Sequence, residues 1–360
     1  MTEPETLIAF NKVSDSIIIS GPDFVGGYVA PEYLVDGVIQ KNRLYALTAN
    51  PYHGKTVIAL RLMFCVAHGL PFGGHETEKS RVLFLAGENP DDAKARVIAS
   101  SDHFGLAVNE DFTFIEGTFN LDETYQAVHT AAGDEGFGLV VIDSNTAFFQ
   151  GEEENSNKQT LENAQAQRRY SELPGRPTVI ALAHPPKNAP RHNLFPRGGS
   201  AYFAEIDGNL TLWSDDHKTT TMHWLGKIRG PQFEPFSFEM HGVTSEKVKD
   251  AKGRLIPSVV ALPVSEERAA QMVVRKRDEQ DIVLEIMLSH RGGSIRDWCK
   301  LVGWVSDTEK KSPMTSKFSR ILETLAGHGL VKQDRDDKYY LTKEGKKEAE
   351  KVLEKGSRAI

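Results

Sequence analysis

The sequence predicts an α/β fold in which helices cover both faces of a mostly parallel sheet, followed by a small C-terminal winged helix-turn-helix domain. Three observations lead to this prediction. Short runs of consecutive apolar residues recur through the first half of the chain, stretches that favour helices separate most of them, and the last quarter reads as three helices, a hairpin and a closing helix. Continuous apolar runs are typical of strands buried on both faces, and their alternation with helices is typical of parallel β-α-β units.

The composition is that of a globular protein. Its 360 residues exceed the roughly 100 to 200 of a single domain, and 39% of them are hydrophobic while 26% carry mixed-sign charges. No apolar run approaches the 18 or so residues of a membrane span, and the N-terminus lacks the pattern of a secretory signal, so we expect no membrane partner and a cytoplasmic location. Cys65 and Cys299 each lie in an apolar helical pattern, which favours reduced core residues over a disulfide or metal site.

The charge is unevenly distributed. The whole chain has a net charge of −7, whereas residues 276–360 carry 18 Lys and Arg against 15 Asp and Glu. This balance argues against a protein coated uniformly for nucleic-acid binding, and it makes the C-terminal part mildly basic. A basic helix face that is merely solvated explains the same balance equally well.

The first 242 residues contain the predicted sheet. Residues 1–30 are expected to form an irregular lead-in, and residues 31–242 the α/β core. Within the core, the apolar runs predict strands at residues 44–49, 82–86, 112–115, 139–142 and 179–183. After about residue 205 the pattern changes to β-rich segments spaced by polar turns, which predicts an antiparallel extension of the same sheet.

The rest of the chain predicts a linker and a second domain. Residues 243–275 have no sustained period and contain two prolines, which indicates a linker with room for one short helix. Residues 276–360 follow the order of a winged helix-turn-helix domain. Its helices are expected at residues 278–289, 295–302 and 316–328, before a two-stranded wing and a closing helix.

The segment from Ala49 to Thr56, with the sequence ANPYHGKT, stands directly after the first core strand and before an apolar helix. A P-loop needs a strand end, backbone N–H groups that face phosphates, a lysine, a hydroxyl for Mg²⁺ and the positive end of a helix. Ala49 takes the place of the usual first glycine, and a surface turn that happens to contain GKT is the alternative. The order of strand, loop and helix favours a phosphate-binding site. Its predicted residues are Asn50, Pro51, Tyr52, His53, Gly54, Lys55, Thr56 and Val57.

Two acids end core strands. Asp143 closes the run LVVID, and beside a P-loop it is expected to act on the Mg²⁺ side together with Thr56. Glu88 follows the strand VLFLA and is expected to polarise the attacking water, because residues at the carboxyl ends of parallel strands line the ligand crevice. Considered singly, Asp143 is equally a turn or cap residue, and Glu88 a first-turn acid of the next helix.

Together these motifs resemble a RecA-type P-loop ATPase, closest to the RepA-like hexameric helicase group of the AAA family ATPases of plasmids, phages and mobile elements. The resemblance spans roughly residues 30–240. The segments that carry it are the P-loop, FLAGEN at 84–89, VVIDS at 140–144, GEEENSN at 151–157, VIALAHPPK at 179–187 and PRGGSAYFAEIDGNLTLW at 196–213. It implies a RecA-like core, ATP and Mg²⁺ as cofactors, single-stranded DNA as partner and assembly into a ring-shaped hexamer.

The resemblance also implies roles for single residues. Glu88 matches the catalytic carboxylate, and His184 matches a sensor of the γ-phosphate. Lys227 and Arg229 in WLGKIRGP resemble a K-x-R motif that one subunit presents to the γ-phosphate of its neighbour. Lys55 completes the predicted catalytic set. Ordinary sheet-surface charges remain the alternative for the K-x-R pair, and a structural histidine for His184.

Nucleic-acid contacts are predicted in two places. Residues 188–198 are expected to form a mobile loop that faces the ring channel, with Arg191, His192 and Arg197 as DNA contacts; a plain surface loop is the alternative. In the second domain Lys317 and Arg320 begin the helix that would enter the major groove, although such domains also bind proteins. The three acids Glu152, Glu153 and Glu154 argue against strong DNA binding by the loop around them.

The sequence therefore predicts an ATPase that acts on DNA in replication or recombination, with a helicase as the leading version. A recombination mediator or loader without unwinding activity is one alternative. A nucleotide-gated DNA-binding regulator is the other.

Overall fold

The computed structural model describes residues 19–153, 156–187, 189–215, 219–306, 311–334 and 337–357. The chain divides into two compact units. The first comprises Met1–Trp213, Thr220–Phe236 and Met240–Ala261, and the second comprises Ser214–Thr219, Ser237–Glu239 and Leu262–Ile360. Most of the predicted lead-in, residues 1–18, lies outside the described residues. Among those described, no helix combines the length and apolar composition that crossing a membrane requires.

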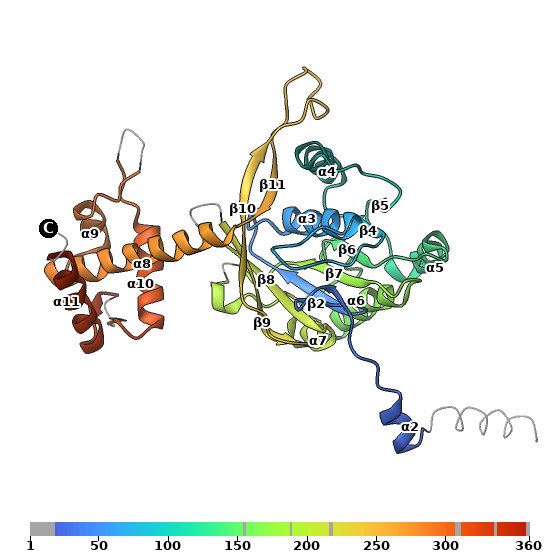
Figure 1. Cartoon of the computed structure of the whole chain (residues 1–360), viewed down its shortest axis with the longest axis horizontal. Coiled ribbons are helices and arrows are strands. Elements are labelled where there is room, and N and C mark those ends of the chain that lie inside the picture. Colours follow the sequence, from blue (N-terminus) through green and yellow to red (C-terminus); the bar gives the residue numbers. More distant parts are fainter. Residues whose placement is uncertain are drawn as a thin grey trace, which may run out of the picture. The chain divides into compact units, whose positions relative to one another are not determined.

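A nine-stranded sheet organises the first unit (Figure 1). Its strands are β3 (Leu44–Thr48), β4 (Val82–Ala86), β5 (Phe112–Glu116), β6 (Leu139–Asp143), β7 (Thr178–Ala183), β8 (Gly208–Ser214), β9 (Thr219–Ile228), β10 (Phe236–Val243) and β11 (Ser258–Pro263). They follow the spatial order β11-β10-β9-β8-β3-β7-β6-β4-β5. The six strands from β8 to β5 pair in parallel, which confirms the predicted α/β fold with a mostly parallel sheet.

The burial of each strand follows from its sequence. Every residue of β3, β4, β6 and β7 is buried, as the continuous apolar runs predict for strands covered on both faces. At the edge of the sheet, only Phe112 of β5 is buried, and the other four residues are partly or fully exposed. The predicted runs therefore locate these five strands to within one or two residues.

Helices cover both faces of this sheet. They are α3 (Lys55–His68), α4 (Pro90–Phe104), α5 (Leu121–Ala132), α6 (Asn157–Arg169) and α7 (Gly199–Glu205). On one face, a core cluster joins α5, α6 and α7 to Leu85 and Ile142. Phe84 points to the opposite face, where its ring contacts the ring of Phe114. The ring of Phe112 lies between those of Phe114 and Phe64, and Phe64 belongs to α3. Figure 1 shows α3 and α4 across the sheet from α6 and α7.

The remaining elements of the first unit are short. They are α2 (Gly21–Gly26), the pair β1 (Tyr33–Val35) and β2 (Ile39–Gln40), and 3-10 turns at Tyr170–Glu172 and Arg191–Asn193. Asn89 and Asn120 cap α4 and α5, since each side-chain oxygen accepts a backbone N–H of the first turn.

The segment 243–275, which the sequence analysis interprets as a linker, is more ordered than that. It contains β11, which pairs beside β10 in the large sheet, and the start of a long helix, α8 (Glu266–Ser289). Its apolar run, residues 259–262, has Pro257 before it and Pro263 after it, and the prolines favour a linker when the sequence is considered alone. Ser265 then caps α8 by accepting the N–H of Arg268 at 3.2 Å.

The second unit has its own core. After α8 come α9 (Ile295–Leu301), α10 (Thr315–Gly327), β12 (Val331–Gln333), β13 (Tyr339–Leu341) and α11 (Lys343–Ser357). β12 and β13 pair in antiparallel fashion. Trp298 stacks on Phe318 at 5.7 Å within a cluster that includes Cys299 and Leu322. Cys65 and Cys299 are both buried and form no disulfide, as the sequence predicts, and burial raises the pKa of both thiols.

Two glycines test how closely the loops before β6 and β7 approach each other. Gly136 and Gly117 both have a positive φ, but a Cβ at Gly136 would lie 2.2 Å from the backbone carbonyl of Pro174, whereas nothing lies within 4 Å of one at Gly117. Gly117→Ala should lower the free energy of unfolding by about 1 kcal/mol through backbone strain alone. Gly136→Ala should lose about 2 kcal/mol more, because the loops before β6 and β7 must separate. Urea denaturation measures both values, and equal losses would contradict the close approach.

Candidate active site

The loop after β3 leads directly into α3. Gly54 caps the helix with φ of 82°, a left-handed conformation that favours glycine. Asn50 ties the loop to the neighbouring segment, since its Nδ2 donates to the carbonyl of Ala189 at 3.0 Å. Tyr52 is fully exposed, and the ring of His53 meets the ring of Trp213 edge-on at 5.1 Å. The N–H groups of the first turn of α3 therefore point out of a fixed loop, as an anion site requires.

Lys55 is the first residue of α3, and its ammonium folds back over the loop. Nζ donates to the carbonyl of Ala49 at 2.9 Å and lies 3.2 Å from Nδ1 of His184. Burial lowers the pKa of Lys55 to about 8, although the carboxylates of Glu88 and Asp143 act in the opposite direction. Because the charge is poorly solvated and only partly compensated, an incoming anion would stabilise it.

Thr56 and Asp143 meet beside this lysine. Thr56 Oγ1 donates to Asp143 Oδ2 at 3.0 Å. Asp143 is 7% exposed, and burial raises its pKa to about 6, with the charge of Glu88 adding to the rise and the Thr56 hydrogen bond opposing it. A hydroxyl and a carboxylate side by side form the oxygen donor set that Mg²⁺ takes from a protein in phosphate sites.

Glu88 and His184 complete the constellation. The backbone N–H of Glu88 donates to the carbonyl of Asp143 at 3.0 Å, so the ends of β4 and β6 are joined. The Glu88 side chain is exposed, and its charge acts on both Lys55 and Asp143. His184 follows β7, and its carbonyl accepts the N–H of Arg197 at 2.8 Å. The carboxyl ends of four parallel strands thus bring Lys55, Thr56, Glu88, Asp143 and His184 to one edge of the sheet.

Lys227 and Arg229 lie at the opposite edge of the sheet, where the parallel strands begin. The N–H of Arg229 donates to the carbonyl of Asp207 at 2.8 Å, and the N–H of Asp207 donates to the carbonyl of Leu44 at 2.7 Å. Leu44 is the first residue of β3, whereas the phosphate loop follows Thr48, its last residue. A strand of this length separates the two edges by roughly 15 Å. The structure therefore does not bring Lys227 and Arg229 to the P-loop of the same chain.

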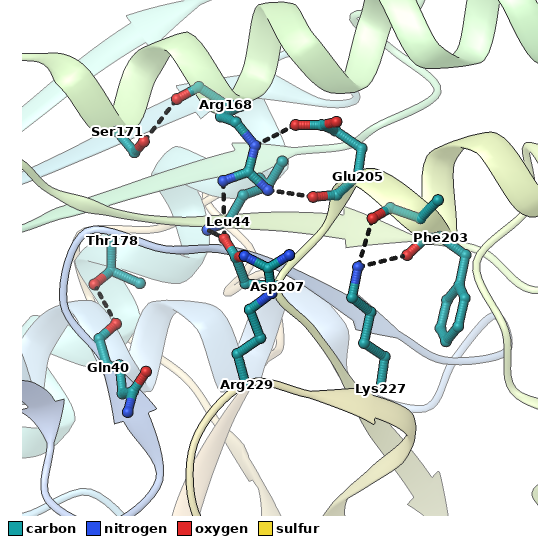
Figure 2. A network of polar contacts seen from close by, with 11 residues as sticks. Gln40, Leu44, Arg168, Ser171, Thr178, Phe203, Glu205, Asp207, Lys227 and Arg229 are labelled. Carbon is teal, nitrogen blue, oxygen red and sulfur yellow. Dashed lines mark hydrogen bonds and ion pairs between the residues drawn. The ribbon is translucent and has the colours of Figure 1, made fainter. Parts of the chain in front are cut away.

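A buried aspartate organises this second edge (Figure 2). Asp207 has a fully buried side chain, whose Oδ2 accepts the N–H of Leu44 at 3.0 Å and Nη1 of Arg168 at 2.9 Å. Arg229 Nη1 lies 3.1 Å from Oδ1 of the same carboxylate. Arg168 also pairs with Glu205 at the end of α7. Asp207 thus lies between two arginines that come from distant parts of the chain.

Lys227 is held beside this network. Its Nζ donates to the carbonyl of Phe203 at 3.4 Å and to that of Ala204, near the end of α7 (Figure 2). Burial lowers the pKa of Lys227, and the neighbouring charge of Arg229 lowers it further. Sequence reasoning identifies the Lys227 and Arg229 pair but misses Asp207 and Arg168. The available signal is an acid placed directly before a buried strand, in the segment IDGN.

Sequence reasoning also misses a buried amide cluster behind the acid of β6. Asn145 Oδ1 accepts Nδ2 of Asn163 at 2.8 Å and Nε2 of Gln167 at 2.6 Å. Tyr202 of α7 donates its hydroxyl to Gln167 Oε1 at 2.9 Å. These bonds connect the segment after Asp143 to α6 and α7.

The residues predicted to contact nucleic acid differ in their exposure to solvent. Arg191, His192 and Arg197 are exposed in the segment after His184, of which residue 188 lies outside the described residues. Arg320 is exposed on α10. Lys317 is not presented to solvent: its side chain is 14% exposed, and Nζ lies 2.9 Å from Glu279 and 4.1 Å above the ring of Trp304. Lys317 packs within its own unit, because a partner carboxylate and an aromatic ring lie beside it.

Residues 27–190 match the sequence model of a family described as an AAA domain, a class of P-loop ATPase. The matched region contains the P-loop, Glu88, Asp143 and His184, and it ends before Lys227 and Arg229. The search of curated proteins found no match. The family match and the mostly parallel sheet support a P-loop ATPase core, a class of domain that generally binds ATP and Mg²⁺.

Asp143→Asn should stabilise the protein near neutral pH. Because burial raises the folded pKa of Asp143 from 3.8 to about 6, the folded state binds more protons than the unfolded chain between these values, and wild-type stability falls as pH rises through that window. The variant escapes this loss, so at pH 7 it should be more stable by up to about 3 kcal/mol and at pH 4 nearly equal.

Denaturant titrations without nucleotide or Mg²⁺ measure this difference. Asp134→Asn, an exposed loop substitution, is the control and should change stability by less than about 0.5 kcal/mol at either pH. A loss of stability in Asp143→Asn at pH 7 would show that the buried carboxylate contributes to folding rather than opposing it.

Proposed function

We propose that this protein is an ATP-hydrolysing motor that acts on DNA, single-stranded DNA above all, and that it is of the RepA-like hexameric helicase type. The observation that carries the proposal is the pair of buried charges, Lys55 and Asp143, with the partly buried Thr56 bonded to Asp143 and the exposed Glu88 beside them. A lysine and an aspartate that are both poorly solvated match a site that a phosphate group and a metal ion complete.

The residues fit ATP and Mg²⁺ in a specific way. The loop amides and Lys55 would bind the phosphates, while Thr56 and Asp143 would hold the metal and its water shell. Mg²⁺ supplies charge neutralisation on the phosphate oxygens. The ammonium of Lys55 now donates to the loop carbonyl of Ala49, and a phosphate oxygen offers the same ammonium a charged acceptor.

Glu88 and His184 would serve hydrolysis and its detection. Glu88 is exposed at the strand end beside Asp143, where its carboxylate orients and deprotonates a water molecule for attack on the γ-phosphate. Nδ1 of His184 lies beside Nζ of Lys55, the group that would also bind this phosphate. The carbonyl of His184 accepts the N–H of Arg197. A change at the phosphate would thus reach the segment that carries Arg191, His192 and Arg197, the proposed contacts to the DNA backbone.

Lys227 and Arg229 would act on a neighbouring subunit. They lie at the opposite edge of the sheet from their own P-loop, so they serve a phosphate only if a second copy brings its carboxyl edge to them. An arginine delivered in trans stabilises charge on the transferring phosphoryl group. This placement supports a ring-shaped homo-oligomer, with a hexamer as the expected form.

The second unit would be a winged helix-turn-helix domain. Its order of three helices, an antiparallel strand pair and a closing helix supports this assignment, with α10 as the helix that enters the major groove. Arg320 is the exposed cation on α10, whereas Lys317 is engaged with Glu279. Such a unit would add a DNA contact to the motor.

ATP turnover with and without single-stranded DNA tests the proposal. We expect the DNA to stimulate turnover, and we expect Lys55→Ala and Glu88→Gln each to reduce it at least about 100-fold through loss of phosphate stabilisation or of the general base. Negligible turnover combined with tight, sequence-dependent duplex binding would instead identify a nucleotide-gated regulator. Stimulation by DNA without strand separation would identify a recombination mediator or loader.

Mixing two inactive variants tests the trans arrangement. Lys55→Ala subunits keep Arg229, and Arg229→Ala subunits keep the P-loop, so a 1:1 mixture that exchanges subunits should recover roughly a quarter of the wild-type rate, the chance that an intact P-loop faces an intact arginine. A mixture of Lys55→Ala with Glu88→Gln is the control and should recover nothing, because both lesions affect the same edge. An inactive first mixture of normal oligomer mass would place Arg229 outside the catalytic site.

A further inference from the structure

The second unit contains a cavity that none of the motifs above uses. It measures about 570 Å³, a size that suits a small ligand or one unit of a polymer. Its walls carry three cations and three aromatic rings, which are Arg291, Lys332, Lys346, Trp298, Tyr339 and Tyr340. None of its lining residues belongs to α10, so it is separate from the helix that would enter a major groove.

The three cations converge from separate elements. Arg291 follows α8, Lys332 lies on β12 and Lys346 on α11. Within the part of the chain that the structure describes, no ion pair involves any of them, whereas Lys317 and Lys351 pair with Glu279 and Glu348. Cations that face one hollow without partners create a local positive potential, which attracts anions.

One acid also lines the cavity. Asp334 Oδ1 accepts the backbone N–H of Lys338 at 2.9 Å, so this carboxylate serves the turn between β12 and β13. With one negative against three positive charges, the cavity remains net positive at neutral pH.

The aromatic rings give the cavity an apolar side. Trp298 is fixed, because its Nε1 donates to the carbonyl of His290 at 2.9 Å and its ring stacks on Phe318. Tyr340 is 37% exposed and Tyr339 is partly buried. The two residues are consecutive on β13 and therefore point to opposite faces, and Tyr340 lies on the same face as Lys332, its pairing partner on β12. A flat apolar face next to several cations is the combination that binds an unstacked base together with its phosphates.

We propose that this cavity binds a phosphorylated nucleotide unit, with the base against Tyr340 and the phosphates against Arg291, Lys332 and Lys346. As part of a single strand it would give the motor a further DNA contact, and in that respect the inference deepens the proposed function. A duplex is a poorer fit, because paired and stacked bases do not offer a face to an aromatic ring. An acidic peptide would use the cations but gain nothing from the aromatic rings.

Fluorescence anisotropy of the full chain with a labelled dT15 oligonucleotide tests the proposal. The double variant Lys332→Ala with Lys346→Ala should lower affinity, and the slope of log affinity against log salt should fall by about 1.4, since each phosphate contact to a single strand contributes about 0.7. Lys347→Ala removes a neighbouring exposed lysine that does not line the cavity, so it is the matched control and should change neither value by a comparable amount.

Tyr340 tests the aromatic part. Tyr340→Ala should weaken dT15 binding about tenfold through loss of stacking, and Tyr340→Phe should keep it. Thermal unfolding of each variant controls for folding. If dT15 binding is absent, or if the cavity variants match Lys347→Ala and wild type, the proposal is wrong. It is equally wrong if polyglutamate competes as well as unlabelled dT15 and Tyr340→Ala has no effect, because the cavity then binds acidic peptides.

Thymidine 3′,5′-bisphosphate distinguishes a free nucleotide from a strand. If the double variant loses both ligands, the cavity takes a single nucleotide; if wild type binds only dT15, it takes the nucleotide as part of a strand. Parallel ATPase measurements separate this inference from the proposed function. Cavity-dependent dT15 binding without ATP turnover would refute the motor alone, and DNA-stimulated turnover with unchanged dT15 binding in the cavity variants would refute the cavity alone.

Discussion

The burial of two opposite charges at the carboxyl edge of a parallel sheet is the constraint on which the rest of the structure depends. Lys55 and Asp143 stand at the ends of central strands whose every residue is buried, so neither charge is well solvated, and burial shifts both pKa values towards neutrality. Such a pair is costly in the empty protein and becomes favourable when phosphate and metal arrive. The surrounding core must therefore be stable enough to tolerate it, which a nine-stranded sheet covered on both faces provides.

One helix connects this edge with the other. Gln167 and Arg168 are consecutive residues of α6, and their side chains bind residues near the two different edges. Gln167 binds Asn145, two residues after Asp143, whereas Arg168 binds Asp207, which in turn contacts Arg229. The acid that would hold the metal and the arginine that would serve a neighbour are thus both supported by the last turn of the same rigid element.

The features that local sequence encodes could be predicted, and those that depend on distant partners could not. Continuous apolar runs located β3 to β7, and the spacing of the P-loop located Lys55 and Thr56, because strand burial and phosphate binding are local requirements. Asp207 was missed because Arg168 and Arg229 approach it only in the folded sheet. Lys317 was assigned to DNA from its position on a helix, yet Glu279 and Trp304 engage it. The strand β11 is not predicted because prolines flank its apolar run and its pairing with β10 forms only in the folded sheet.

For DNA binding, the local arrangement of charged residues matters more than the net charge of the chain. A chain with a net charge of −7 repels a polyanion at long range, so DNA contact has to rest on places where cations lack partners. Two places of this kind in the described structure carry the proposed DNA contacts. The segment after His184 presents Arg191 and His192 to solvent next to the nucleotide site, and the cavity of the second unit gathers Lys332 and Lys346 from separate elements. Contacts of this kind release few counterions each, and they would therefore suit the proposed motor, which has to release its strand repeatedly.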